Sequence, residues 1–480
     1  MNTIKQIFLT GFFIIFTSVC DAQQSPYFSA LSNVAYPQKV AAVKNRKVPV
    51  IYPDKKNQKA FEEIVADRNE SLADDFINNR VLYDSVLLKT CNNVIQKLRV
   101  ANPGFPYDSI SLYINRSVIT NASSWGEGSV FINLGTFLWL DNEDELALLT
   151  GHELSHKFLQ HFESKARKNI SIFSSQDFKD ELKEIRKSKD GKYERYKDLV
   201  KDLVTQSGKH SRYKESEADS LGMVMIRNAG YDVKKAATLL LKLDHSADFF
   251  NSGNIYDVRG AFEKAGAESY LFKENKRYNG LSMAAVTMNA DKGIDTIKTH
   301  PDCIVRWRKI SGNTTNDTAV NCCIKLTSAM QPLKERALTE LVRSAYENNR
   351  LTLCIHLCLF AKANGYDLPF YNYFISAAFS GIVAADRHFE KFASTDARAS
   401  AGSTLKELQD FIFKANTETV SKISLWYLEN SGDQASEDFS FARLKYDTDV
   451  LKKDRQEAQK KLQAQFPNSK YSYLFKPKTP

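Results

Sequence analysis

The chain has 480 residues, of which 43% are apolar and 26% are charged. These proportions are typical of an ordinary globular protein, and the length exceeds what one compact core usually holds, so we expect two folded domains. The net charge is +9, and most of the basic surplus lies between Lys157 and Lys214, where basic and acidic residues alternate. This alternation is typical of a solvated helix surface with i to i+4 ion pairs, and it argues against a nucleic-acid-binding protein.

The first 22 residues have the pattern of a secretory signal peptide. Lys5 precedes an apolar run from Ile7 to Val19, and Cys20-Asp21-Ala22 offers small residues at the positions that determine cleavage. We therefore expect an exported, periplasmic protein. A lipoprotein anchored through Cys20 is the less favoured alternative, because Val19 is larger than the residue that usually precedes a lipidated cysteine. No later segment has 18 uninterrupted apolar residues, so we expect no transmembrane span in the mature chain.

Two segments ahead of the first chemical motif are predicted to be extended. Residues 23–65 contain prolines and lysines and are weakly periodic, which predicts an N-terminal lead that crosses the surface of the following domain. Residues Val130 to Leu134 alternate enough to form an edge strand. Because an edge strand has unpaired backbone groups, a peptide could pair with it as an additional strand, largely irrespective of its side chains.

The next predicted element is a helix that begins after Asn142. Asn142 can act as the N-cap, and Glu145 can complete a capping box in an acidic first turn. Gly151 should cost this helix about 1 kcal/mol relative to alanine, which indicates that a neighbouring backbone passes close to it. A stripe at three- or four-residue spacing predicts one buried face, and its members are Leu146, Leu149, His152, His156 and Leu159.

This helix carries a His-Glu-x-x-His motif at residues 152–156. Residues four apart lie about 40° apart around a helix, so His152 and His156 project from one face and can reach one metal ion. Glu153 is offset by one residue, which lets its carboxylate take a proton from a metal-bound water instead of binding the metal. Such a motif arises by chance in roughly one chain in a hundred of this kind, so a third ligand is needed.

Two nearby positions are poor candidates for that third ligand. His161 lies five residues past His156, about 140° round the helix, which predicts a place in the second layer or at the surface. A third histidine six residues past His156 would suggest a metzincin, but that position is Phe162.

A second predicted helix, running from Arg212 to a stop at Gly230, supplies better candidates. Glu215 and Asp219 are four residues apart and share one face of this helix. One of these carboxylates can bind the metal while the other accepts the free ring N–H of a liganding imidazole. Two imidazoles and a carboxylate suit zinc best among the divalent ions. The segment between the two helices could also be a lid over the cleft or lie against a polyanionic surface.

Four blocks of residues between 66 and 312 resemble one family of zinc metallopeptidases. This family includes the BepA-type and HtpX-type enzymes and the CAAX prenyl endoprotease, which are gluzincins with an HExxH helix and a later ExxxD helix. In chain order, the blocks are Asn121-Ala122 with Gly128–Gly135, then Glu145–His161, Ser211–Asp219, and Thr299-His300-Pro301 with Arg306. Residues 123–127 depart from the family pattern, which usually has a more apolar stretch with proline and glycine before the strand. The resemblance implies a mainly α peptidase domain with a small β-sheet (α+β) at residues 66–312, and the soluble, exported, BepA-like branch of the family.

The resemblance also assigns the site. It implies His152, His156 and Glu215 as the ligands of one zinc ion per chain, and Glu153 as the general base. Asp219 then belongs to the second shell around the zinc. Two further assignments concern residues that do not bind zinc in the active state, namely His300 and Arg212.

His300 either stabilises the oxyanion or caps the zinc in a latent state, and a histidine that only fixes a loop is the alternative. Arg212 is a weaker oxyanion donor and is as readily a structural partner of a zinc carboxylate.

The remainder of the chain, residues 313–480, is predicted to be an all-α domain. A polar, turn-forming run at residues 311–318 is the expected boundary. Helices of 12 to 20 residues with short links suggest hairpins resembling tetratricopeptide repeats, and a plain helical bundle is the alternative. The predicted helices are Leu333–Asn348, Leu351–Ala363, Pro369–Ala385, Thr404–Asn416 and Asp447–Phe466.

Together these features predict a zinc-dependent endopeptidase that cuts extended segments of unfolded or misassembled envelope proteins, with envelope-protein partners at the helical domain. A second hypothesis is a chaperone or scaffold whose helical domain binds clients while His300 caps a latent zinc site. A purely structural zinc site is disfavoured, because such sites usually have four protein ligands rich in cysteine.

Overall fold

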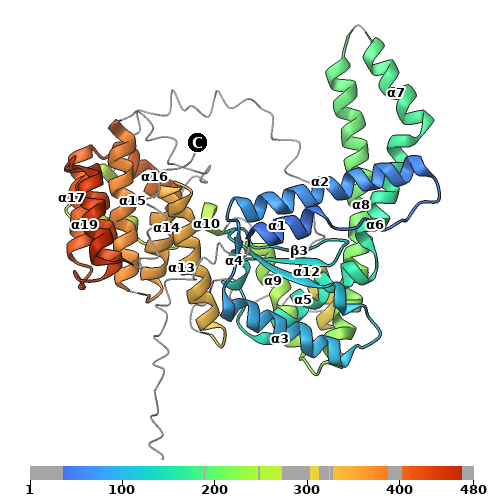
Figure 1. Ribbon diagram of the computed structural model, residues 1–480, viewed down its shortest axis with the longest axis horizontal. Coiled ribbons are helices and arrows are strands. Elements are labelled where there is room, and N and C mark those ends of the chain that lie inside the picture. The colour runs from blue at the N-terminus through green and yellow to red at the C-terminus, as the bar shows by residue number, and fades with distance from the viewer. Residues whose placement is uncertain are drawn as a thin grey trace, which may run out of the picture.

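The computed structural model describes residues 36–188, 190–246, 249–272, 303–312, 324, 328–366, 368–387 and 403–467. The predicted signal peptide and His300 lie outside these residues, as does most of the predicted boundary at 311–318. The fold is mainly helical with one small sheet, so the predicted α+β peptidase part followed by helices is confirmed (Figure 1). None of the described helices is long and apolar enough to cross a membrane.

The predicted extended lead is wrong over much of its length. Residues Tyr36–Lys44 form α1, and α2 runs from Lys55 to Ile77. The Asp54 side chain caps α2 by accepting a hydrogen bond from the Asn57 N–H. The buried face of α2 contains Gln58 and Asn69 beside its apolar residues, and these polar members obscured the helical period in the sequence.

The sheet has four strands in the order β1-β2-β4-β3. Strands β2 and β4 are parallel, while β1 pairs with β2 and β3 pairs with β4 in antiparallel fashion. The predicted edge strand is therefore wrong: β4 lies inside the sheet and is buried at four consecutive residues, as expected of a strand covered on both faces. The strands at the two edges are β1 and β3, and β3 is a short strand with two serines. The bounds are Val81–Leu82 (β1), Ser111–Asn115 (β2), Ala122–Ser124 (β3) and Ser129–Asn133 (β4).

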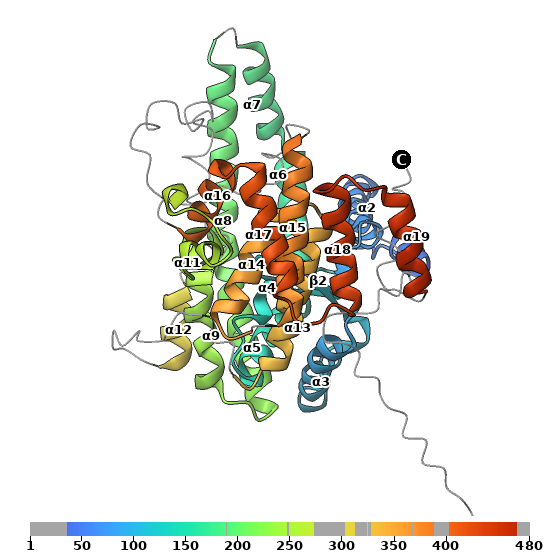
Figure 2. The same ribbon diagram turned by 90° about the vertical axis from the view of Figure 1, so that its left-hand side faces the viewer.

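Helices pack around this sheet, with α5 at the centre of the peptidase part. Helix α5 contacts α3, α8 and α9, and α2 lies against α6. Helix α7 and the first part of α8 form a hairpin that projects from the body (Figures 1 and 2). The bounds are Ser85–Ala101 (α3), Tyr107–Ser109 (η2), Leu134–Phe137 (α4), Glu143–Phe158 (α5), His161–Ser174 (α6), Gln176–Lys187 (α7), Lys192–Asn228 (α8), Val233–Ser246 (α9) and Cys303–Ser311 (α12).

The C-terminal helices are more numerous than the sequence predicted. Helix α15 packs against α14 before it and against α17 and α18 after it. The predictions missed α17, and they merged the end of α18 with α19, which the turn at Lys452 (φ 57°) and the cap at Asp454 separate. The bounds are Gln331–Glu347 (α13), Leu351–Ala363 (α14), Pro369–Arg387 (α15), Thr404–Lys414 (α16), Thr417–Glu429 (α17), Glu437–Asp449 (α18) and Arg455–Gln465 (α19).

One segment from the predicted peptidase domain packs with these C-terminal helices. It contains α10 (Phe249–Ser252), α11 (Val258–Glu263) and η3 (Ser269–Phe272). The Phe262 ring stacks on Phe411 of α16, with centroids 4.7 Å apart. By its packing, this segment belongs to the helical region.

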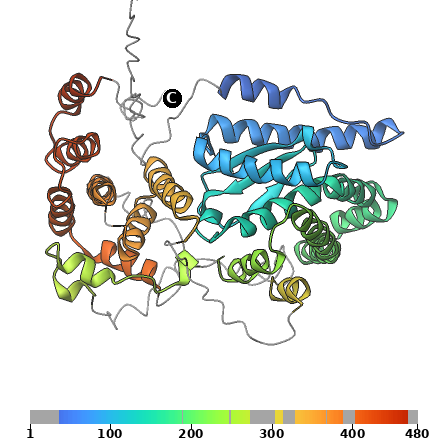
Figure 3. The same cartoon turned by 90° about the horizontal axis from the view of Figure 1, so that it is seen from below.

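The two regions share one continuous apolar core, and Figure 3 shows them side by side. Helix α13 packs against α3 and α4 of the peptidase part. At this junction the buried Lys334 Nζ lies 2.7 Å from Asp141 Oδ1. Because Asp141 directly precedes the cap of α5, the helical region contacts the start of the helix that carries the metal-binding motif.

Candidate metal centre

The start of α5 is fixed by buried polar contacts. Asn142 Oδ1 accepts a hydrogen bond from the Glu145 N–H at 3.0 Å, so the predicted N-cap is confirmed. The Glu145 carboxylate does not return to Asn142 as in a capping box. It accepts instead from the Asp141 N–H and from Lys242 Nζ, each at 2.6 Å. Since Glu145 is fully buried, these contacts compensate the loss of its hydration and hold the helix at one position.

Helices α5 and α8 cross where each has a glycine. A Cβ atom built on Gly222 would lie 3.0 Å from His152 N and 3.1 Å from the carbonyl carbon of Gly151. The sequence predicted that a neighbouring backbone passes close to Gly151. This prediction is confirmed, and the backbone is that of Gly222 in α8. The close crossing sets the separation between the histidines of α5 and the carboxylates of α8.

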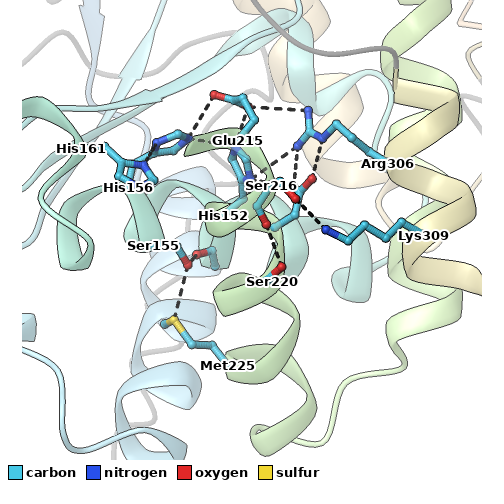
Figure 4. A network of polar contacts seen from close by, with 12 residues as sticks. His152, Ser155, His156, His161, Glu215, Ser216, Ser220, Met225, Arg306 and Lys309 are labelled. Atoms are coloured by element: carbon cyan, nitrogen blue, oxygen red, sulfur yellow. Dashed lines mark hydrogen bonds and ion pairs between the residues drawn. The ribbon is translucent and has the colours of Figure 1, made fainter. Parts of the chain in front are cut away.

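Three side chains converge above this crossing (Figure 4). His152 Nε2 lies 3.1 Å from His156 Nε2 and 3.4 Å from Glu215 Oε2, and His156 Nε2 lies 3.4 Å from Glu215 Oε1. Ligands bound to zinc at 2.0 to 2.1 Å in a tetrahedron are about 3.3 Å apart, so the trio has the spacing of a single zinc ion. Three protein donors also leave one coordination position for a reactant, as catalytic sites do.

The electrostatic surroundings of His152 also favour a cation. Burial opposes a charge on this ring, but hydrogen bonds to Asp219 and Glu215 raise the pKa of His152 to about 10. Two carboxylates that hold a proton this firmly also attract a metal ion. The residues present therefore fit a divalent cation.

A second layer orients His152. Its Nδ1 lies 2.9 Å from Asp219 Oδ1, which is the place that the sequence predicts for this carboxylate. Arg306 of α12 donates to Asp219 Oδ2 from Nε at 2.7 Å and to Oδ1 from Nη2 at 2.6 Å. Burial of Asp219 opposes ionisation, but its hydrogen bonds to His152 and Arg306 lower the pKa of Asp219 to about 2.

The sequence predicts Arg212 in this layer, but Arg212 is exposed. Arg306, and not Arg212, contacts Asp219. The signal for Arg306 was present in the sequence, because this residue belongs to the His-Pro block of the resemblance. Nothing in that block showed that its arginine would meet Asp219, which is 87 residues away in the chain.

His156 has its own second-layer partner, His161. The Nδ1 atoms of the two rings are 2.8 Å apart. Helix α5 ends before His161, and Gln160 has a left-handed conformation (φ 55°), so the 140° offset of a continuous helix does not apply. Burial, together with the charge of Lys214, lowers the pKa of His161 and favours its neutral form. A neutral His161 can accept the Nδ1 proton of His156 and leave His156 Nε2 facing the centre.

Glu153 is buried and opens onto a cleft of about 370 Å³. His156 and Glu215 line the same cleft, and so does the edge strand β3. The general base that the sequence predicts is thus beside the predicted metal ligands and faces the space where a substrate would lie. His300, the other predicted catalytic residue, lies outside the described residues, so its role stays a prediction.

Comparison with known proteins agrees with this geometry. No curated protein matches the chain. Residues 89–314 match the sequence profile of Peptidase family M48, and this segment contains the sheet strands β2 to β4, α5, α8 and Arg306. Residues 89–314 therefore form a peptidase domain of family M48, a family of zinc metallopeptidases.

Proposed function

We propose that this protein is a zinc-dependent endopeptidase with one zinc ion per chain. The observation that carries the proposal is the convergence of His152, His156 and Glu215 at 3.1 to 3.4 Å, with Glu153 beside them in an open cleft. These three residues would hold the zinc ion, which when bound supplies a Lewis acid for the scissile carbonyl and lowers the pKa of a water molecule.

The side chains of the chain provide the rest of the chemistry. Glu153 removes a proton from the attacking water and returns it to the leaving amine. Asp219, held by Arg306, keeps the proton of His152 on Nδ1, and His161 does the same for His156. Both imidazoles then keep their Nε2 atoms directed at the centre throughout the reaction.

The edge strand β3 supports an extended polypeptide as the substrate. Among the described strands, β3 pairs only with β4, and residues Ala122–Ser124 line the cleft. Its outer backbone groups can bind a polypeptide as an additional antiparallel or parallel strand. Folded proteins rarely offer a free extended segment, so we propose unfolded or misassembled proteins as substrates. The N-terminal sequence pattern and the BepA-like features support the cell envelope as their location.

A proteolysis assay with a matched variant tests the proposal. The zinc-loaded protein should cleave casein, an unfolded protein, at internal bonds. The variant Glu153→Gln has nearly the same shape and should retain zinc but lose at least about a hundredfold in rate, since it removes the general base. Equal cleavage by both proteins would contradict the role of Glu153. Intact casein with both proteins, but cleavage after His300→Ala, would favour the latent centre of a chaperone or scaffold.

A further inference from the structure

One wall of the cleft is basic, and the proposed hydrolysis does not use its charges. The wall consists of Arg68 from α2, Lys165 and Lys168 from α6, and Lys214 from α8, and we call these four residues the basic wall. Among the described residues that line the cleft, the acidic ones are Glu153 and Glu215, and both belong to the metal centre. The rest of the cleft therefore has an excess of positive charge.

Arg68 is held in a defined position within this wall. Its guanidinium carbon lies 3.9 Å from the centre of the Trp125 ring and 4.9 Å from that of Phe162. Its Nε is buried and has no hydrogen-bond partner among the described residues. The Glu127 carboxylate forms its ion pair with Arg46, at 2.8 Å. Its attraction for the Arg68 guanidinium acts over a longer distance. A planar cation fixed between two aromatic rings is suited to bind a carboxylate with its unused N–H groups.

Lys214 is a buried cation with a neutral partner. Its side chain is largely enclosed, with 8% of the residue exposed, and Nζ donates to the His161 carbonyl oxygen at 2.9 Å. No carboxylate among the described residues lies within ion-pair distance of Lys214: Glu163 contacts Lys157 and Glu217 contacts His161. A buried ammonium group that lacks a counter-ion is unfavourable, and an anionic ligand would stabilise it.

Lys165 and Lys168 extend the positive charge toward solvent. They are three residues apart and therefore lie on one side of α6, next to the cleft. Lys165 is exposed and Lys168 is half-buried, and both line the cleft. The buried Lys214, the half-buried Arg68 and Lys168, and the exposed Lys165 form a site for a negatively charged group in the cleft that Glu153 and Glu215 also line.

We propose that the basic wall binds a carboxylate of the polypeptide substrate, so that the enzyme selects acidic segments. This inference rests on the proposed function and names its substrate class. The carboxylate has two sources: an aspartate or glutamate side chain close to the cleaved bond, or the C-terminal carboxylate of the polypeptide. Backbone pairing with β3 supplies affinity that does not depend on sequence, and the basic wall supplies the preference.

A binding experiment tests the inference without relying on hydrolysis. Zinc-loaded Glu153→Gln protein is titrated into three fluorescent twelve-residue peptides, and anisotropy is recorded. The first peptide is neutral with an amidated C-terminus, the second has glutamates in place of its glutamines, and the third is the neutral peptide with a free C-terminus. We expect a peptide with a carboxylate to bind at least about fivefold more tightly than the neutral one, and the difference to shrink as salt is raised.

The three peptides distinguish the two possible sources of the carboxylate. Tighter binding of the glutamate peptide identifies a side chain as the ligand, whereas tighter binding of the third peptide alone identifies the chain terminus. Equal affinity for all three peptides overturns the proposal. If casein is not cleaved by the parent protein but the acidic peptide still binds more tightly, only the proposed hydrolysis fails.

Two charge-reversal variants distinguish binding at the basic wall from attraction by the net charge of the protein. Lys165→Glu, at an exposed position of the basic wall, should abolish the preference for the acidic peptide without changing the zinc content. Lys183→Glu makes the same charge change on the exposed surface of α7, outside the cleft, and should leave the preference intact. An equal loss of preference in both variants would mean that net charge alone attracts the peptide, and the proposal would be wrong.

Discussion

Arg306 contacts Asp219 and also lies 3.8 Å from the predicted metal ligand Glu215. It holds both oxygens of Asp219, and Asp219 in turn fixes the His152 ring. We predict that Arg306→Gln lowers zinc affinity by about tenfold to a hundredfold, because His152 loses its fixed orientation. Competition with a chelator of known affinity measures the change. The control is Arg212→Gln, which removes an exposed arginine from the neighbouring helix and should leave zinc affinity unchanged. An equal loss in the two variants would assign the effect to charge alone.

The buried His356 should make the stability of the protein depend on pH. It is fully buried in α14, where its Nδ1 lies 2.7 Å from the Tyr256 hydroxyl oxygen. Burial lowers the pKa of His356 to about 4, from an ordinary value near 6.5. The unfolded chain therefore binds this proton more tightly than the folded protein, so the contribution to stability is complete above pH 6.5 and is lost as the pH falls toward 4.

Between pH 7 and pH 4, His356 should lower the free energy of unfolding by about 3 kcal/mol, at up to about 1.4 kcal/mol per pH unit. His356→Gln keeps a side chain that can bond Tyr256 but does not titrate. Urea unfolding of both proteins across this range gives the difference, in which contributions shared by the two proteins cancel. A difference that does not vary with pH would show that His356 does not remain neutral in the folded protein.

Among the helices, the crossing of α5 and α8 determines the geometry of the centre. A Cβ atom at Gly222 would lie 3.0 Å from His152 N and 3.2 Å from its Cα, and the helix backbone there cannot move aside without moving His152. We predict that Gly222→Ala destabilises the protein by about 1 kcal/mol, since overpacking outweighs the gain of about 1 kcal/mol in helix propensity. Zinc affinity should fall about tenfold, because Glu215 moves away from His152.

The matched control for this crossing is Ser220→Ala, two residues away on the exposed side of α8. It should leave both zinc affinity and the midpoint of thermal unfolding close to those of the parent. If Gly222→Ala binds zinc as the parent does, the close helix contact does not set the ligand spacing.

The elements that the sequence predicted well are those whose sequence features lie within the element itself. Helix α5 has an Asn142 cap and an acidic first turn, and these features need no knowledge of the rest of the fold. The predicted buried stripe is wrong in its extent, because every residue from Glu145 to Ser155 is buried and Leu159 is exposed. The candidate metal-binding residues on α5 and α8 could be named for the same reason, because their spacing along each helix places them on one face. Helix α2 was missed since its buried face includes the polar residues Gln58 and Asn69, which interrupt the apolar stripe of a helix.

Other features depend on contacts between distant segments. Strand β3, Ala122–Ser124, is too short to show an alternating hydrophobic pattern, so its position at an edge of the sheet follows only from the strand order. Likewise, Arg306 is 87 residues from Asp219, and nothing near either residue indicates the pair. The basic wall combines α2, α6 and α8, so it too becomes visible only when the chain is folded.

For the whole molecule, buried charges join the helical region to the peptidase part. Asp141 binds Lys334 of α13 at 2.7 Å and Lys242 of α9 at 2.6 Å. We predict that Asp141→Asn destabilises the protein by about 3 kcal/mol, because the two buried ammonium groups of Lys334 and Lys242 would lose a shared anionic partner. Chemical denaturation measures the change. The control Glu418→Gln disrupts an exposed pair with Lys422 and should cost less than about 0.5 kcal/mol. Similar costs in the two variants would show that the buried pair has no special role.

The shared core leads to a prediction about truncation at the predicted boundary. A chain that ends at residue 312 would lose Phe411, which stacks on Phe262, and both acidic partners of the buried Arg116, which are Glu340 and Glu347. Exposed apolar surface and an unpaired buried cation should prevent this fragment from folding as a soluble monomer, whereas the full chain should unfold in one cooperative transition. Size-exclusion chromatography of the fragment and calorimetry of the full chain check the two outcomes. A soluble fragment that binds zinc as tightly as the full chain would instead establish two independent domains, with the helical region free to act as a separate module for binding other proteins.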